Sequence, residues 1–350
     1  MHIFDLKKRP ILLLPVGMIV LGIATGFGMT TNGKSNDPRD ASTEIPITPK
    51  LVVGVDACAK CHAAEIGVWK MTPHHETFQT LHRKPAAQEI AKKLGISSFK
   101  HDSACIKCHY TLQDTPSGLD PIAGVSCESC HGPAKNWVDI HHNYGGPGVK
   151  RDQETDAHRQ ERLNSAIAGG MRNPVNVYLV AQSCYRCHTV PDENLVNVGG
   201  HVAGSMNFEL VAWSQGKIRH NFVRSDGKVN EPSSPERLRL MFLSGMIADL
   251  EFSLRATAAA TVKADFGKTS AQRAQRATKR LTAAQIKVNL PILDEILSIA
   301  NGVKLKLNNK EELLGAADKI NELGIRFAAT TDGAKLDGID KFLPPLDQWK

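Results

Sequence analysis

Four short repeats built on cysteine pairs constrain this chain more than any other feature of its sequence. All eight cysteines of the 350-residue chain fall into pairs separated by two residues, and a histidine directly follows each pair. The pairs are Cys58/Cys61, Cys105/Cys108, Cys127/Cys130 and Cys184/Cys187, and the histidines are His62, His109, His131 and His188. Chance would place four histidines there with a probability of about 10⁻⁶.

The C-x-x-C-H pattern is the attachment signature of c-type haem. Two thiols add to the two vinyl groups of one porphyrin as thioethers, and the next residue is placed under the ring, where its imidazole can bind the iron. We therefore predict four covalently bound haem c groups, with the eight cysteines as thioether sites and the four histidines as proximal ligands. No cysteine is left over, so no disulfide is expected.

Zinc and disulfides are the alternative uses of these cysteines. The eighteen residues between Cys108 and Cys127 fit a zinc-ribbon spacing, and an exported chain can join its cysteines as disulfides. Neither alternative explains why a histidine follows every pair, and haem attachment does.

The N-terminal segment has the pattern of an export signal. A basic cluster at residues 7–9 precedes an apolar run at 11–29. This run is also about long enough to span a bilayer. We expect residues 1–29 to be a signal peptide or a membrane anchor, with 30–50 as a linker. The rest of the chain would then be periplasmic, either soluble or attached to the inner membrane through residues 10–29.

The positive net charge of the chain is weak evidence for an anionic partner, because the mature protein with its haems would be nearly neutral. The chain has a formal charge of +7. Loss of Asp5, Lys7, Lys8 and Arg9 with the signal removes a net +2. Four ferric haems with ionised propionates, at about −1 each, would bring the rest near neutrality. Redox partner proteins are therefore expected, and nucleic acid is not.

Each haem iron has a second axial position, and histidine is the favoured occupant here because no methionine stands out by its place in the sequence. Ten further histidines are available, and His2 would leave with the signal. The remaining nine are His74, His75, His82, His101, His141, His142, His158, His201 and His220.

Two longer motifs resemble the tetrahaem cytochrome c-554 family over about residues 53–220. The first haem motif is followed by W-K-M-T-P-H at 69–74, similar to the family's W-K-x-T-x-H. The third stands in G-V-S-C-E-S-C-H-G-P at 124–133, close to the family's G-V-x-C-E-S-C-H-G-P. Asn136 and Trp137 follow, and then His141 stands where the family has a ligand histidine.

The resemblance implies a set of distal ligands. By it, His74 would bind the third haem, His141 the first and His220 the fourth, with Phe208 near the fourth haem. The family's second haem has no protein ligand on its distal side, but this chain has an additional candidate, His201, which would close the second site or displace His220 at the fourth. His75 and His142 are alternates to their neighbours, and His82, His101 and His158 are expected to be solvent-facing or supporting residues.

The expected fold is mainly α with long loops. Residues 51–232 would form a tetrahaem domain of short helices, one of them starting near Trp69, with almost no sheet. Residues 233–350 contain no cysteine or histidine and predict an antiparallel helical bundle. The first helix of the bundle is expected to begin at Ser234. The second is expected to run from Thr269 or Ser270 to Lys287, and the third from Pro291 to 301–302. The fourth is expected to run from Asn309 to Gly324.

A basic stretch at 263–287 is either a solvated helix face or a docking face for an acidic redox partner or lipid head groups. The function that best fits these patterns is electron transfer, because two histidine ligands leave the iron no open site. The enzymatic alternative is reduction of a small nitrogen compound at an open second haem, that of His109. A structural haem conduit is a third interpretation.

Overall fold

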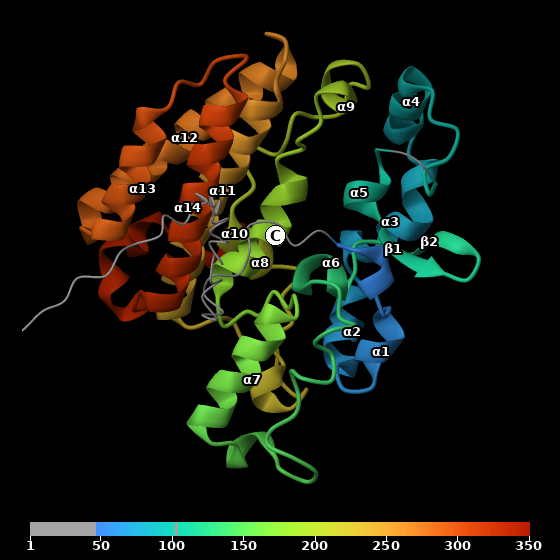
Figure 1. Ribbon diagram of the computed structural model, residues 1–350, viewed down its shortest axis with the longest axis vertical. Coiled ribbons are helices and arrows are strands. Elements are labelled where there is room, and N and C mark those ends of the chain that lie inside the picture. The colour runs from blue at the N-terminus through green and yellow to red at the C-terminus, as the bar shows by residue number, and fades with distance from the viewer. Residues whose placement is uncertain (1–46, 102–103) are drawn as a thin grey trace, which may run out of the picture. The chain divides into compact units, whose positions relative to one another are not determined.

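The computed structural model describes residues 47–101 and 104–350 and is mostly helical (Figure 1). The apolar run expected to act as a signal or anchor lies outside the described residues. Within the described residues, no helix is both long and apolar enough to cross a membrane.

Seven α-helices separated by loops, and one hairpin, form the described segment that contains the first three cysteine motifs. The helices are α1 (Val55–Ala59), α2 (Ala63–Trp69), α3 (Pro73–Thr80), α4 (Pro85–Leu94), α5 (Ile106–His109), α6 (Cys127–His131) and α7 (Asp156–Ala168). The strands β1 (Thr111–Thr115) and β2 (Gly118–Ala123) form an antiparallel hairpin that pairs Thr115 with Gly118 next to the turn. Trp69, expected near the start of a helix, is the last residue of α2. The next helix, α3, begins at Pro73, where the Thr72 hydroxyl caps it by accepting the backbone N–H of His75.

Five longer helices and two five-residue helices, α9 and α10, follow in the rest of the described chain. They are α8 (Val177–His188), α9 (Glu193–Asn197), α10 (Leu210–Ser214), α11 (Pro235–Ala259), α12 (Asp265–Val288), α13 (Pro291–Gly302) and α14 (Lys310–Thr330). The 3₁₀ segment Gly333–Phe342 follows α14. The Ser234 hydroxyl caps α11 and Pro291 opens α13, as predicted.

Two helix boundaries differ from the expectation. The second long helix, α12, begins at Asp265, before the expected Thr269 or Ser270. The last long helix, α14, begins at Lys310 after Asn309, but it continues through Gly324 to Thr330. Gly324 is a packing position: a Cβ built there would lie 2.3 Å from the ring of Tyr178. The glycine therefore admits an aromatic ring of α8 and does not end the helix.

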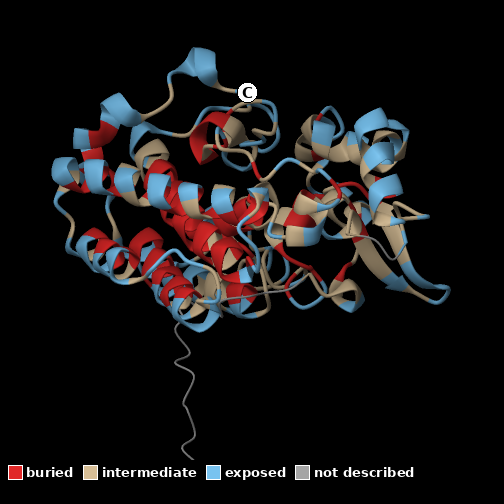
Figure 2. Ribbon diagram, turned by 90° about the horizontal axis from the view of Figure 1, so that it is seen from above, coloured by how far each residue is buried: buried red, intermediate tan, exposed pale blue. Residues whose placement is uncertain are grey.

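One apolar core joins α8 to the C-terminal bundle. Buried side chains from Ile167 to Val211 and from Met241 to Ile339 belong to the same hydrophobic cluster, and α11 packs against α8, α10, α12 and α14. Figure 2 shows the buried residues concentrated in these helices. The boundary predicted near residue 232 thus does not coincide with a break in the hydrophobic core.

A buried polar network also ties α8 to the bundle. The Glu251 carboxylate of α11 accepts the Tyr178 hydroxyl at 2.7 Å and the Gln182 side-chain amide at 3.1 Å, and it pairs with Arg255 at 2.9 Å. Gln182 also donates to Asn321 of α14. Because buried polar groups need partners, this network fixes the position of α8 as well as contributing contacts.

Candidate haem sites

A single helical turn builds each of the four cysteine motifs. The backbone N–H of His62 donates to the carbonyl of Cys58 at 3.0 Å, and that of His109 donates to Cys105 at 3.0 Å. The third motif is the whole of α6, and the fourth is the last turn of α8. Side chains three and four residues apart lie on one helix face. Each turn therefore presents two thiols and one imidazole to the same side, as one porphyrin requires.

Contacts between thiols show which motifs are neighbours. All eight cysteines are free thiols. The thiols of Cys58 and Cys127 lie close enough to shift each other's pKa, and so do the thiols of Cys108 and Cys187. The first motif therefore lies against the third, and the second against the fourth. A zinc ribbon would instead bring the second and third pairs together around one ion.

Cys61 differs from the other seven predicted attachment cysteines in its surroundings. The other seven are half-buried, but Cys61 is exposed. The physical reason is its place in the chain, because it lies beyond the end of α1, in the turn that leads to α2. Its backbone N–H still donates to the carbonyl of Cys58 at 3.2 Å, so the turn of the motif is formed. Protein packing therefore holds the Cys58 side of the first motif and leaves the Cys61 side open to solvent, and thioether formation at Cys61 stays a prediction.

The third and fourth motifs are also in contact. The Arg186 guanidinium, inside the fourth motif, donates to the carbonyl of Ser129 in the third at 3.1 Å. The Ser183 hydroxyl donates to the carbonyl of Cys130 at 2.8 Å. The four motifs thus form a connected series in the order first, third, fourth, second.

Three of the four motif histidines have a second imidazole at the distance expected across an iron. The ring centroids of His62 and His141 are 6.3 Å apart, and those of His131 and His220 are 6.1 Å apart. The rings of His188 and His74 are 6.4 Å apart. Two metal–imidazole bonds of about 2 Å each, together with the half-widths of the rings, place the centroids of two axial imidazoles about 6 Å apart.

The partners of His74 and His220 are the reverse of the expected ones. The sequence resemblance implied that His74 would face the third motif and His220 the fourth, but His74 lies beside His188 and His220 beside His131. The Thr77 hydroxyl donates to the carbonyl of His109 at 2.9 Å, which holds the middle of α3 against the second motif. Since the fourth motif packs on the second, His74 reaches His188.

Hydrogen bonds to the backbone orient several of these rings. Nδ1 of His141 lies 2.6 Å from the carbonyl of Val138, and Nδ1 of His220 lies 2.6 Å from the carbonyl of Ile218. A carbonyl can only accept, so Nδ1 must carry the proton. The lone pair is then on Nε2, which is free to bind a metal.

Burial favours the neutral form of three of the four motif imidazoles. It lowers the pKa of His109, His131 and His188 to about 4, and it also lowers the pKa of His74 and His141. A neutral imidazole is the form that coordinates a metal ion, so no proton has to be displaced at neutral pH.

The second motif has different neighbours. After burial, the neighbours that lower the pKa of His109 are, in order, His201, Lys84 and His74. Nδ1 of His201 lies 2.9 Å from the carbonyl of Val202, which leaves its Nε2 available, as in His141 and His220. His201 is thus among the groups around the second motif and not beside His188.

The remaining histidines have other contacts. The ring of His75 packs edge-on against Trp69 at 4.5 Å, and His142 is exposed beside His141. His158 is hydrogen-bonded to the Glu154 carboxylate at 2.7 Å. His82 accepts a hydrogen bond from Arg83 at 3.3 Å, and His101 is exposed.

Packing in the first half of the chain fits haem as the missing part of the core. Residues 47–165 bury few apolar side chains: Val52, Ile66, Ala91, Tyr110, Ala123, Ala134 and Trp137. So small an apolar core cannot account for the ordering of this segment, because ordering each residue costs about 1–2 kcal/mol of conformational entropy. Four porphyrins placed at the motifs would supply the apolar surface.

Buried donors without a partner support the same conclusion. They include the Tyr110 hydroxyl, the indole N–H groups of Trp137 and Trp213, and Nε of Arg186 and of Arg219. The Trp137 ring is 5.2 Å from that of His141, and the other four belong to or adjoin residues of the motif clusters. A buried donor normally has an acceptor, and the propionates of haem are acceptors. The residues present therefore fit the predicted cofactor.

Sequence reasoning missed the residues that hold these motifs in place. Oε1 of Glu128, inside the third motif, accepts the backbone N–H of Val53 at 2.9 Å and of Ala134 at 2.8 Å, and its Oε2 accepts that of Gly54 at 2.8 Å. The Arg273 guanidinium of α12 donates to the carbonyl of His188 at 3.2 Å. Local spacing does not signal these roles, because Val53, Gly54 and His188 lie more than 70 residues from the side chains that bind them.

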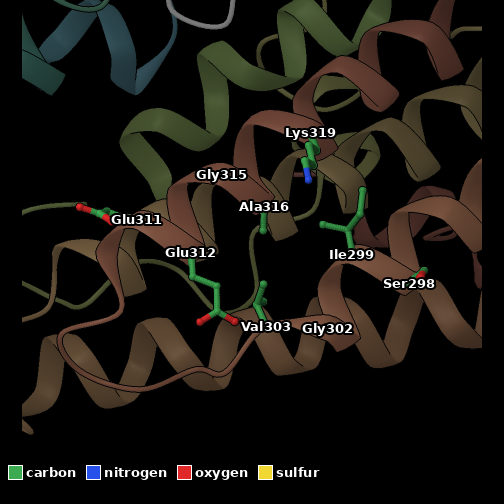
Figure 3. Close-up of a pocket in the computed structure, with 9 residues that line it drawn as sticks. All are labelled: Ser298, Ile299, Gly302, Val303, Glu311, Glu312, Gly315, Ala316 and Lys319. Carbon is green, nitrogen blue, oxygen red and sulfur yellow. The ribbon is translucent and has the colours of Figure 1, made fainter.

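The cavity in Figure 3 is not part of these sites. It has a volume of about 390 Å³ and lies between α13 and α14, where Ile299, Val303, Glu312 and Lys319 contribute to its wall. No motif residue lines it.

Comparison with known proteins identifies the segment that carries the motifs. Residues 57–132, which include the first three motifs, match the family described as cytochrome c554 and c-prime. The resemblance to the cytochrome c-554 family is confirmed. Cytochrome c-554 from Nitrosomonas europaea is 29% identical over 169 residues, which cover 42% of this chain and 67% of that protein. No solved structure matches the chain. The family match supports covalently bound haem c, iron binding and electron transport.

Proposed function

We propose that this protein is a tetrahaem c-type cytochrome that relays electrons between redox partners outside the cytoplasm. The observation that carries the proposal is the set of three imidazole pairs, 6.1–6.4 Å apart, each formed by a motif histidine and a histidine from elsewhere in the chain. Bound haem iron supplies one-electron chemistry between its ferric and ferrous states. The protein contributes the attachment points, the axial ligands and the order of the sites.

Each axial pair joins distant parts of the chain. His141 is the proposed distal ligand at the first site, His220 at the third and His74 at the fourth. His201 is the proposed ligand at the second. Because each of these histidines follows a different motif from the one it faces, the ligands link the segments to one another.

The contacts between motifs support a linear relay. The first motif adjoins the third, the third adjoins the fourth, and the fourth adjoins the second. Electrons would therefore enter at one of the outer sites, the first or the second, and leave at the other. Export through the N-terminal segment and a periplasmic location complete the proposal.

Counting haems and sorting their spin states tests the relay. The mass of the mature protein should exceed that of the polypeptide by four haem groups. Its ferric spectrum should be wholly low-spin, and the reduced protein should not bind carbon monoxide. A reductase acting at an open second site would instead show one high-spin haem that binds carbon monoxide.

Replacement of the proposed first distal ligand provides a matched test. His141→Ala should create one high-spin haem that binds carbon monoxide, while His142→Ala should not, although His142 is adjacent and also contacts the carbonyl of Val138. Electron paramagnetic resonance and carbon monoxide difference spectra of both variants give the answer. Identical spectra in the two variants would remove His141 from the first site.

A further inference from the structure

We propose that the surface around the second motif is the docking site for a negatively charged redox protein. This inference rests on the electron relay proposed above and names the chemistry of one of its partners. We call this surface the second-motif patch. It consists of the cations Arg83, Lys84, Lys92, Lys93 and Lys107 and the valines Val198 and Val202.

Two cations of the patch lie at the second motif, and all five face solvent. Lys107 lies inside the motif, and the charge of Lys84 acts on His109. Arg83, Lys84, Lys92, Lys93 and Lys107 are all exposed. In the described part of the chain, none of the five lies within salt-bridge distance of a carboxylate. No carboxylate side chain of the described residues therefore neutralises their charge, which is available to an anionic partner.

The valines join the patch through contact between α4 and the loop that follows α9. A Cβ built on Gly199 would lie 3.0 Å from a methyl group of Leu94, and one on Gly200 would lie 3.1 Å from the ammonium nitrogen of Lys93. Val198 is 55% exposed and Val202 is 74% exposed, on either side of these glycines. Figure 1 shows α4 and α9 at the same end of the molecule. Apolar side chains beside unpaired charge are typical of the core and rim of a protein interface.

The outer site at the other end of the relay has a different charge. Residues 83–107 contain six basic and two acidic residues, whereas 55–79, around the first motif, contain two basic and three acidic ones. The two ends of the proposed relay therefore attract partners of different charge. An acidic protein is steered to the second motif and not to the first.

The basic stretch of α12 is a weaker candidate because several of its cations have partners inside the protein. Arg273 is buried and pairs with Asp249 at 2.5 Å. Arg276 donates to the carbonyl of Met206 at 2.9 Å, and the Arg280 guanidinium lies over the ring of Phe242. The cations that remain exposed on α12 provide a control surface for the experiment.

Charge reversal tests the patch with small redox ions. Lys84→Glu, Lys92→Glu and Lys93→Glu are combined in one variant. The control combines Lys268→Glu, Lys279→Glu and Lys287→Glu, three exposed residues of α12. Each reduced holoprotein is mixed with anionic hexacyanoferrate(III) or cationic tris(phenanthroline)cobalt(III) at about 10 mM ionic strength, where screening is weak.

Oxidation of the patch variant by hexacyanoferrate should slow at least about tenfold, and its oxidation by the cobalt complex should quicken. The control variant should stay within about twofold of the wild type with both ions. Equal responses of the two variants, or a larger response of the control, would overturn the proposal.

A second measurement uses a protein probe, an acidic flavodoxin in its hydroquinone form. The rate at which it reduces the oxidised holoprotein should saturate with flavodoxin concentration, and the patch variant should lose that saturation. Binding of the wild type to phosphatidylserine vesicles through the same lysines, without saturation by flavodoxin, would assign the patch to membranes and overturn the proposal.

The proposed electron relay is tested separately, by measuring the haem content and the reversible reduction of each sample before mixing. A sample that carries four reducible haems but shows no local charge effect refutes only the docking site.

Discussion

Replacing Glu128 should uncouple the first motif from the third. This carboxylate is 1% exposed, and it accepts three backbone N–H groups: those of Val53 and Gly54 just before the first motif, and that of Ala134 just after the third. Hydrogen bonds to charged groups contribute about 1.5–3 kcal/mol each. Glu128→Ala leaves all three donors without this acceptor, so we expect the free energy of unfolding to fall by about 5 kcal/mol.

Glu128→Gln is the finer test. The amide keeps one oxygen, which can still accept two of the N–H groups, and puts an NH₂ group opposite the third. We therefore expect a loss of about 2 kcal/mol. Guanidinium unfolding of the holoprotein, followed by circular dichroism, measures both variants, and exposed Glu76→Gln on α3 serves as the control. A loss below about 1 kcal/mol in Glu128→Ala would refute the argument that these bonds hold the two motifs together.

Two further changes test packing and electrostatics. Gly324→Ala should destabilise the protein by about 1–3 kcal/mol, because its Cβ would meet the ring of Tyr178. Gly315→Ala in the same helix has open space around its Cβ and should stabilise the protein by about 0.5–1 kcal/mol. Equal shifts of the melting temperature in the two variants would contradict this reasoning. The guanidinium of Arg162 holds the pKa of Glu154 at about 2, below its ordinary 4.5. The stabilisation from this carboxylate is therefore complete above about pH 4.5 and disappears as pH falls toward 2, so Glu154→Gln should flatten the acid limb of a plot of unfolding free energy against pH.

Local spacing is the basis for predicting the attachment sites, and long-range packing determines which imidazoles lie side by side. One helical turn determines that Cys184, Cys187 and His188 lie on one face, so the motif needs no tertiary information. The distance between His74 and His188 depends instead on how α3 is held against the second motif and how that motif meets the fourth. Spacing along the chain does not contain either contact, and the family resemblance suggested a different partner.

Helix boundaries show the same division between local and tertiary causes. Ser234 begins a helix by a local hydrogen bond, and its position was predictable from the sequence. Gly324 resembles a helix end in the sequence, but in the structure its missing side chain leaves room for the ring of Tyr178 on α8. Tertiary contact therefore overrides the usual meaning of a glycine where a helix is tightly packed.

The C-terminal bundle makes the fourth motif different from the other three. The first three motifs lie on helices of four or five residues or at their ends, in a segment with few buried apolar side chains. The fourth ends a helix whose other turns are buried in the bundle, and Arg273 of α12 reaches the carbonyl of His188. Apolar packing and buried hydrogen bonds hold this motif, whereas the others depend on contacts among motifs and, in the proposed holoprotein, on the haems. Because the fourth motif touches both the third and the second, a rigid fourth site fixes the two halves of the proposed relay relative to each other.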